Sequence, residues 1–266
     1  STASQQQQQQ PSRAAMGYWE PHTSSMDFCE ENYRFTYYVA ELLNCMSSLP
    51  IAVSGAWAWM VTPPSYRCKK RLALGWLALS TVGLGSAAFH ATLRRPAQAM
   101  DELPMVLGNL VLVFCLCLPE GVWISRLAAC LGLLGAMLTI VYLVFEAYVV
   151  FFVMYGGVVV CLFAESARLV ATETQGPNVR VMRQLWAWSL GTYGVGVLFW
   201  ITDNVLCAKL GVGHLHIVWH GLACAGSLFF MLLLIALTAN REGTELQVRL
   251  HLGVMPQLVA RSAKSS

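Results

Sequence analysis

Two histidines, His216 and His220, lie four residues apart in an apolar stretch of the chain. In a helix this spacing places both side chains on one face, one turn apart, as in helices that bind zinc through paired histidines. A catalytic zinc site needs a third protein ligand and leaves one position to water. His90 is the remaining histidine that we place inside the predicted helix bundle, at the same depth as His216 and His220. Three such imidazoles indicate a divalent metal site, although each alone is more often a hydrogen-bonded core histidine.

Two further residues could act beside such a metal. Ser86 precedes His90 by four residues, so both side chains share a helix face, although a serine there could simply hydrogen-bond to its own backbone. Asp101 lies at the start of another predicted helix, at the same depth as His90, and its carboxylate could take a proton from attacking water. A route with Ser86 as nucleophile needs a base beside it, and His90 would be occupied by the metal. We therefore favour attack by water.

The composition indicates a membrane protein. Of 266 residues, 56% are apolar and 12% are charged, against about 25% charged residues in an average soluble domain. So little charge cannot cover the surface of a water-soluble protein of this length. The net charge of +3 forms no basic stripe, and the nine cysteines have no dense regular spacing. These features exclude a soluble enzyme, a nucleic-acid binder and a small disulfide-rich secreted domain.

Seven stretches free of Asp, Glu, Lys and Arg approach the roughly 20 residues that a membrane-spanning helix needs. They cover residues 42–66, 72–93, 103–119, 127–145, 147–164, 184–202 and 210–240. Backbone groups in lipid must be hydrogen-bonded within the segment, which favours helices. The sequence therefore predicts an all-α integral membrane protein, in which residues 35–240 form a seven-helix transmembrane bundle with an intramembrane metal site.

The two ends of the chain differ from this bundle. Residues 1–34 contain a run of glutamines at 5–10, which predicts a disordered tail followed by an acidic segment. Residues 241–266 are polar and predict a cytosolic tail, with a possible amphipathic stretch around 246–254. Twelve Lys and Arg residues fall on the C-terminal side of the membrane and five on the other side. This bias predicts a lumenal N-terminus and a cytosolic C-terminus.

The polar residues at the ends of the expected spans gather on the lumenal side. Charged groups in a membrane are costly and commonly functional, although Glu102 and Glu146 taken singly could be ordinary interfacial residues. We expect His214 to be interfacial or exposed, because it points away from the face of His216. The gathered residues are Glu41, His90, Asp101, Glu102, Glu146, Asp203, Asn204, His214, His216 and His220.

Several motifs resemble the alkaline ceramidase family. They are G-S-A-A-F-H at 85–90, D-E-L-P-M at 101–105, F-W-I-T-D-N at 199–204 and H-I-V-W-H at 216–220. Two more, G-Y-W-E-P at 17–21 and D-F-C-E-E-N-Y at 27–33, are similar to its type 3, phytoceramidase-like branch. The resemblance runs from Gly17 to the end of the last span. It places the chain in a superfamily of seven-span metal-dependent hydrolases that includes the adiponectin and progestin receptors.

The resemblance implies an activity and a set of site residues. The family cleaves the amide of ceramide to sphingosine and a fatty acid. Its three zinc ligands fall on His90, His216 and His220, and its catalytic serine and aspartate fall on Ser86 and Asp101. The expected substrate is ceramide or phytoceramide that enters from the bilayer, with water as the second reactant. We expect the protein in the endoplasmic reticulum or the Golgi, with no nucleic-acid partner and no obligate protein partner.

The resemblance also implies a regulatory Ca²⁺ site near the N-terminus. Its ligands fall on Asp27, Glu30, Asn32, Glu41 and the backbone carbonyl of Phe28, where the family usually has Trp. Oxygen ligands of this kind suit Ca²⁺. Their spacing is not that of an EF-hand, so the residues alone would equally indicate a solvated acidic turn and a helix cap.

Two further contacts are expected around the site. Ligating imidazoles need a partner on the second ring nitrogen, and Asp203 and Asn204 are our candidates. Cys29 and Cys207 both fall on the lumenal side, where disulfides persist, so we predict a bond between them that holds the N-terminal segment over the site.

The sequence thus predicts a Ca²⁺-regulated, zinc-dependent intramembrane amidohydrolase that acts on ceramide. Two alternatives stay open. One is a lipid receptor or sensor of the same superfamily, in which zinc is structural. The other is a hydrolase of lipid esters or GPI anchors.

Overall fold

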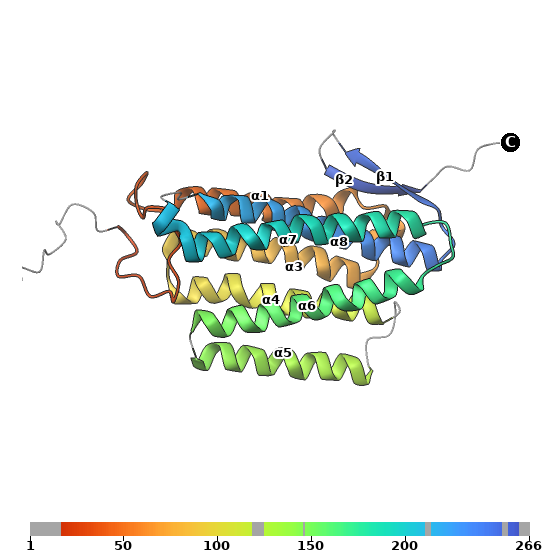
Figure 1. Ribbon diagram of the computed structural model, residues 1–266, viewed down its shortest axis with the longest axis horizontal. Helices are drawn as coiled ribbons and strands as arrows, with labels where there is room; N and C mark the ends of the chain where they lie inside the picture. The colour runs from red at the N-terminus through yellow and green to blue at the C-terminus, as the bar shows by residue number, and fades with distance from the viewer. Residues whose placement is uncertain (1–16, 119–124, 146, 211–213, 252–254, 261–266) are drawn as a thin grey trace, which may run out of the picture.

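The computed structural model describes residues 17–118, 125–145, 147–210, 214–251 and 255–260, and in this part of the chain seven long helices lie side by side (Figure 1). A short helix, α2 (Pro64–Arg67), joins the first two of them. The long helices are α1 (Leu42–Val61), α3 (Lys70–Thr92), α4 (Arg95–Cys117), α5 (Arg126–Phe145), α6 (Tyr148–Thr172), α7 (Val179–Leu210) and α8 (Leu215–Arg241).

These helices correspond one to one, in order, to the seven expected spans. Five of them, α3, α4, α5, α6 and α8, are long and apolar enough to cross a membrane. The all-α membrane fold is therefore confirmed. Membrane crossing by α1 and α7 stays a prediction, and so does the count of seven spans. Glu146, the expected link between the fourth and fifth spans, lies outside the described residues.

Two helices extend beyond the charge-free stretches. Helix α4 begins at Arg95, with a proline in its first turn, whereas the sequence suggested a start near 103. Helix α7 continues to Leu210 rather than stopping near 202. Asp101, Glu102 and Asp203 therefore lie inside helices and not at their ends. Their carboxylates face the interior of the bundle, where all three residues are buried.

Residues 17–41 fold back over the end of the bundle at which α1 begins, which we call the N-terminal end. The backbone N–H groups of Thr23 and Ser24 both donate to the carbonyl of Leu93, at 3.1 Å each. Leu93 ends α3 in a left-handed conformation, with φ of 47°. The N–H of Glu41 donates to the carbonyl of His90 at 2.9 Å. These bonds attach the segment to the last turn of α3, whereas the glutamine run at 5–10 lies outside the described residues.

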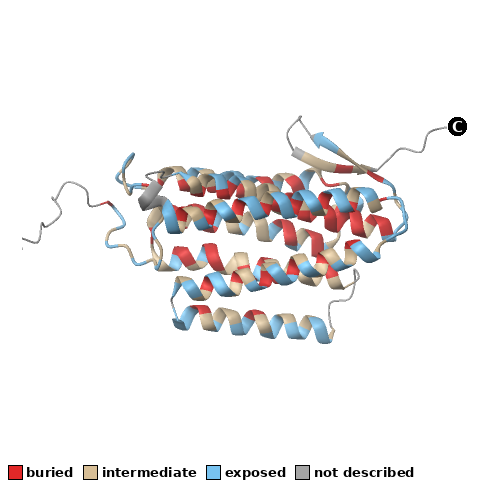
Figure 2. Cartoon of the chain, in the orientation of Figure 1, coloured by how far each residue is buried: buried red, intermediate tan, exposed pale blue. Residues whose placement is uncertain are grey.

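Helix α8 forms the centre of the bundle. Its residues 231–237 are all buried, as expected for a helix that is apolar on every side. Figure 2 shows buried positions along α1, α3 and α8, whereas α5 is mostly exposed or intermediate. In α5 only Gly135 and Tyr142 are buried. The remaining apolar surface of α5 suits contact with lipid.

The chain after α8 forms a hairpin at the opposite end of the bundle (Figure 1). Strands β1 (Leu246–His251) and β2 (Met255–Ala260) pair antiparallel, with Val248 opposite Leu258. The stretch that the sequence indicated as amphipathic begins with a strand, in which apolar residues alternate with polar ones in Leu246-Gln247-Val248, as in a strand with one buried face. Asn178 fixes the hairpin to α7: its Oδ1 accepts from the N–H of Leu246 at 2.8 Å.

Candidate metal centre and active site

The three predicted imidazoles meet at the N-terminal end of the bundle. His90 lies in the last turn of α3, and His216 and His220 lie in the first two turns of α8. Their candidate ligand nitrogens all lie within 4.8 Å of one another. The exposed fractions of His90, His216 and His220 are 0%, 4% and 3%. Two helices that are distant in sequence thus bring together three buried imidazoles, as the sequence predicted.

The ring nitrogens of this cluster show how it suits a metal ion. Nδ1 of His90 is 2.5 Å from Oε2 of Glu41, and Nδ1 of His220 is 2.7 Å from Oγ of Ser47. These contacts leave Nε2 of each ring for a metal. Nε2 of His90 is buried and has no hydrogen-bond partner in the described part of the chain. A buried nitrogen is rarely left unpaired in a folded protein, so this one indicates a ligand.

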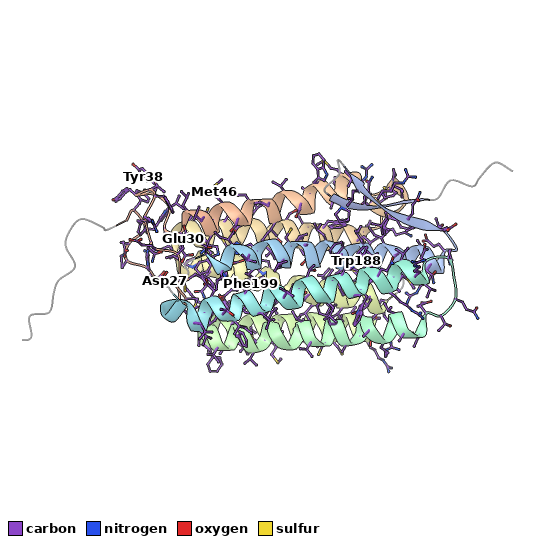
Figure 3. All side chains as sticks on the ribbon, turned by 45° about the horizontal axis from the view of Figure 1, so that its top comes forward. Asp27, Glu30, Tyr38, Met46, Trp188 and Phe199 are labelled. Carbon is purple, nitrogen blue, oxygen red and sulfur yellow. The ribbon has the colours of Figure 1, made fainter. Side chains whose placement is uncertain are left out.

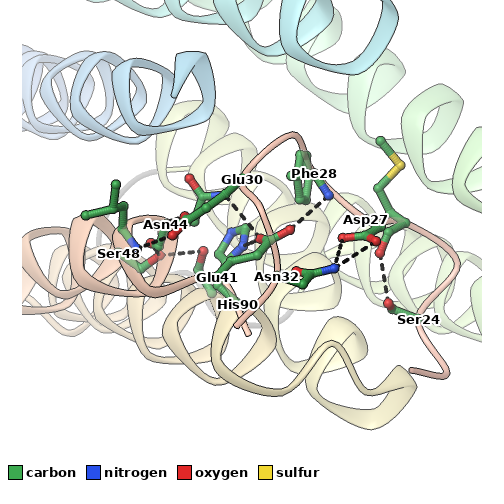
Figure 4. Close-up of polar contacts among 12 residues, drawn as sticks. Ser24, Asp27, Phe28, Glu30, Asn32, Glu41, Asn44, Ser48 and His90 are labelled. Carbon is green, nitrogen blue, oxygen red and sulfur yellow. Dashed lines mark hydrogen bonds and ion pairs between the residues drawn. The ribbon is translucent and has the colours of Figure 1, made fainter. Parts of the chain in front are cut away.

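Glu41 connects the histidine cluster to the N-terminal segment (Figure 4). Its carboxylate accepts from the backbone N–H of Phe28 at 3.0 Å and from the amide of Asn44 at 3.1 Å, besides its contact with His90. The residue is completely buried, and burial raises the pKa of Glu41 well above its ordinary value. Such a carboxylate can fix the ring orientation of His90 and the nitrogen that carries its proton.

Sequence reasoning assigned this positioning role to Asp203 and Asn204 instead. The amide of Asn204 donates to the carbonyl of Trp200 at 2.7 Å, one turn earlier in α7. The carboxylate of Asp203 is buried near the start of α8, and neither of its oxygens has a hydrogen-bond partner in the part of the chain that the structure describes. Among the described residues, no side-chain hydrogen bond joins either residue to a ring of the cluster. Asp203 instead suits the positive end of the α8 dipole.

The roles of Glu41 and Ser47 were missed for different reasons. Glu41 was recognised as a polar residue at the correct end of the bundle, but only as a ligand for calcium. Ser47 gave no signal, because its partner His220 is 173 residues away and the contact depends on the packing of α1 against α8.

Asp27 and Glu30, two of the residues expected to bind calcium, lie at the N-terminal end of the bundle (Figure 3). The carboxylate of Glu30 accepts from the backbone N–H groups of Leu43 and Asn44, at 2.7 Å each, and so caps α1. The amide of Asn32 donates to both oxygens of Asp27, at 3.0 Å each. In the described part of the chain, the three histidines form the one cluster of His, Cys, Asp or Glu atoms close enough to share an ion.

Phe28 has a contact that the sequence did not indicate. Its ring centroid lies 3.8 Å from that of His216, so its side chain covers one side of the histidine cluster. Only its backbone carbonyl was expected to take part, as a calcium ligand. The calcium ligand set as a whole stays a prediction.

Ser86 and Asp101 lie together next to the histidines. Ser86 lies next to the carboxylate of Asp101, and its Oγ accepts a hydrogen bond from Oγ of Ser48 at 3.0 Å. A glycine permits this approach of α3 to α4: a Cβ at Gly85 would lie 1.9 Å from the carbonyl oxygen of Met100. A larger residue at Gly85 would separate the two helices and with them the serine and the carboxylate.

A pocket begins at these residues and extends into the bundle. Its polar lining is concentrated at the metal end, where Ser86, Asp101, Glu102, His216 and His220 contribute. Glu102 is held in place there by the amide of Gln98 at 2.9 Å and the hydroxyl of Tyr142 at 2.6 Å. Most of the remaining lining is apolar or aromatic. This arrangement suits a molecule with one polar, reactive end and a long apolar part.

The predicted Cys29–Cys207 disulfide depends on a residue whose side chain lies outside the described residues. Sγ of Cys29 lies 3.1 Å from the backbone oxygen of Asp203, and Cys207 follows Asp203 by one turn of α7. The bond stays a prediction. Among the described residues, the cysteines that form no disulfide are Cys45, Cys68, Cys115, Cys117, Cys130, Cys161 and Cys224.

Comparison with known proteins gives a consistent result. The family model described as Ceramidase matches residues 20–258. Alkaline ceramidase 3 of Mus musculus is 34% identical over 239 residues, which cover 81% of this chain and 84% of the mouse protein. Alkaline ceramidase of Arabidopsis thaliana is 28% identical over 252 residues, covering 93% and 97%. Alkaline ceramidase 1 of Homo sapiens is 26% identical over 242 residues, covering 85% and 88%.

Proposed function

The chain belongs to the ceramidase family, and from this premise we propose that it hydrolyses the amide bond of ceramide at a zinc ion held by His90, His216 and His220. The products are sphingosine and a free fatty acid. The observation that carries the proposal is the set of three buried imidazoles beside Ser86 and Asp101, at the polar end of an apolar pocket. Three neutral nitrogen ligands with one open position are typical of catalytic zinc.

Zinc, when bound, supplies a Lewis acid that activates water and polarises the amide carbonyl. The carboxylate of Asp101 takes the proton of the attacking water and then delivers it to the leaving amine nitrogen. The hydroxyl of Ser86 lies beside Asp101, and during the reaction it donates to the carbonyl oxygen as negative charge develops there. Glu41 and Ser47 keep the rings of His90 and His220 oriented.

Water rather than Ser86 is the nucleophile in this proposal. A serine nucleophile needs a base that removes its proton and is itself oriented by a third group. The neighbours of Ser86 are Asp101 and the hydroxyl of Ser48. His90, on the same helix face, has its Nδ1 occupied by Glu41 and its Nε2 assigned to zinc.

The surroundings of the site support a lipid substrate from the bilayer. The pocket walls are largely apolar, and the adjacent helix α6 is among those apolar enough to cross a membrane. We place this end of the bundle on the lumenal side of the endoplasmic reticulum or Golgi membrane, from the distribution of Lys and Arg. There, Ca²⁺ at Asp27, Glu30, Asn32, Glu41 and the Phe28 carbonyl regulates activity through Glu41, and a Cys29–Cys207 disulfide holds the segment in place.

A substrate panel tests the proposed reaction. Purified protein is incubated with ceramide, phytoceramide, a diacyl lipid ester and a GPI-anchored peptide, and the products are identified by mass spectrometry. We expect fatty acid and free sphingoid base from the two ceramides only. Release of fatty acid from the ester or cleavage of the anchor alone would indicate another hydrolase of the superfamily. Binding of ceramide without turnover would indicate a receptor or sensor.

A further inference from the structure

The pocket that begins at the histidines continues well into the other half of the bundle. On α8 its lining runs from His216 to Met231, and on α3 from Phe89 to Gly75. At about 1.5 Å of rise per residue, these stretches are about 22 Å and about 21 Å long. The hydrocarbon thickness of one leaflet is about 15 Å, half of the roughly 30 Å core. The pocket is therefore about as deep as one lipid chain is long.

Small side chains line the part of this pocket that lies farther from the histidines. Ala78 on α3, Gly108 on α4, and Ala223, Cys224 and Ser227 on α8 all contribute to its wall. A Cβ at Gly108 would lie 3.2 Å from the Cβ of Ala78, so the two helices approach closely there. Because these side chains are short, they fill little of the pocket, and we take this stretch as the path of a hydrocarbon chain.

The channel ends at Met231. A Cβ placed on Gly75 would lie 2.6 Å from Sδ and 2.7 Å from Cε of Met231, and 3.4 Å from Cδ2 of Leu112. The thioether therefore lies directly over Gly75, beside Leu112, and the exposed fraction of Met231 is only 2%. All three residues line the pocket. Beyond Met231 the next residues of α8, 232–237, are buried in continuous apolar packing.

We propose that Met231, packed on Gly75 and Leu112, is the floor of a channel that limits the length of one hydrocarbon chain of the substrate. The proposal rests on the proposed function, since the reactive amide must lie at the histidines while the chain extends toward the floor. The apolar walls fit either the fatty acyl chain or the sphingoid chain of a ceramide, which share the same chemistry. Met231 is thus a residue that determines specificity and takes no part in the reaction.

The experiment measures kcat/KM for two series of ceramides, in detergent–lipid micelles. One series varies the acyl chain on a constant sphingoid base, and the other varies the base on a constant acyl chain. Each buried methylene contributes about 0.8 kcal/mol, or roughly fourfold in kcat/KM. In Met231→Ala, we expect chains two carbons longer than the wild-type optimum to gain roughly fifteenfold relative to that optimum. In Ala78→Leu, which narrows the channel midway, the optimum shifts to shorter chains.

A matched control separates specificity from general damage to the core. Met182 on α7 is fully buried in the same hydrophobic cluster and is not among the residues that line the pocket. Met182→Ala should lose stability, as large-to-small core substitutions do, and keep the wild-type chain-length profile. The series that shifts in Met231→Ala identifies the chain that occupies the channel.

Two results would overturn the proposal that Met231 is the floor. One is an unchanged chain-length profile of Met231→Ala in both ceramide series. The other is an equal shift of the chain-length optimum in Met182→Ala. Failure of the proposed function is a different outcome, in which the wild-type protein hydrolyses no ceramide. The floor is then tested by binding, through native mass spectrometry of the ceramides retained by wild type and Met231→Ala. Retention of longer chains by the variant supports the floor, and identical retention refutes it.

Discussion

The histidine cluster and the acidic N-terminal residues were both expected to bind metals, and they are adjacent and share Glu41, yet they are built differently. The histidines lie on two long helices, and their unpaired nitrogens point to a ligand. The acidic side chains lie in the segment before α1 and already accept hydrogen bonds from the protein, as Glu30 does from the start of α1. Geometry alone therefore supports a metal at the histidines, whereas an ion at the acidic residues would have to compete with these bonds.

Removal of a histidine ligand should cause the largest loss of ceramide hydrolysis. We expect His220→Ala to lose zinc and to reduce kcat/KM for ceramide by on the order of 10³-fold, since the Lewis acid contributes several kcal/mol. His214, an exposed residue that precedes α8, provides the matched control. His214→Ala should keep metal and activity, both measured on the same preparations. Equal loss in the two variants would show that the start of α8, rather than the metal, was damaged.

Asp101→Asn should separate chemistry from metal binding. We expect a loss of about 10²- to 10⁴-fold in kcat, the range of general acid–base catalysis, with an unchanged zinc content. Steady-state kinetics together with elemental analysis provide the check. Should the variant remain as active as the wild type, proton transfer must be assigned to another group.

Glu41→Gln and Ser47→Ala should weaken the site through the histidines that they orient. Losses of about 10- to 100-fold in zinc affinity are typical of such partners. Glu41 should have the larger effect, because its carboxylate also accepts from the N–H of Phe28 and the amide of Asn44 and so holds the N-terminal segment beside the site. Competition with a chromophoric chelator measures the affinity. An unaltered zinc affinity in Glu41→Gln would disprove its positioning role.

The acidic residues should give the smallest effects, and two substitutions distinguish cap from ion site. Glu30→Gln weakens the cap of α1, which should reduce the free energy of unfolding by about 1 kcal/mol with or without calcium. Asp27 is exposed and bonded only to Asn32 among the described residues. Asp27→Asn should leave the calcium-free protein unchanged and abolish any stabilisation by added Ca²⁺. If calcium stabilises neither wild type nor variant, the acidic residues form a cap and turn only.

The sequence was informative where function depends on periodicity and composition. The spacing of His216 and His220, together with the level of His90, was enough to predict the cluster. Helix ends were less accurate, because Asp101 and Asp203 interrupt the charge-free stretches although both residues are buried inside helices. The roles of the Ser47, Phe28 and Met231 side chains could not be predicted, since each side chain acts through contacts between distant segments. The alternation in residues 246–248 was a usable signal for the hairpin.

The central claim is that the three imidazoles hold a catalytic zinc ion. The most direct measurement is the zinc content of purified wild type and His216→Ala, with ceramide hydrolysis assayed on the same samples. We predict one zinc per wild-type chain, and activity that disappears on chelation and returns with zinc. His216→Ala should have neither zinc nor activity. A wild-type protein that hydrolyses ceramide without metal, or a variant that keeps both metal and turnover, would contradict the claim.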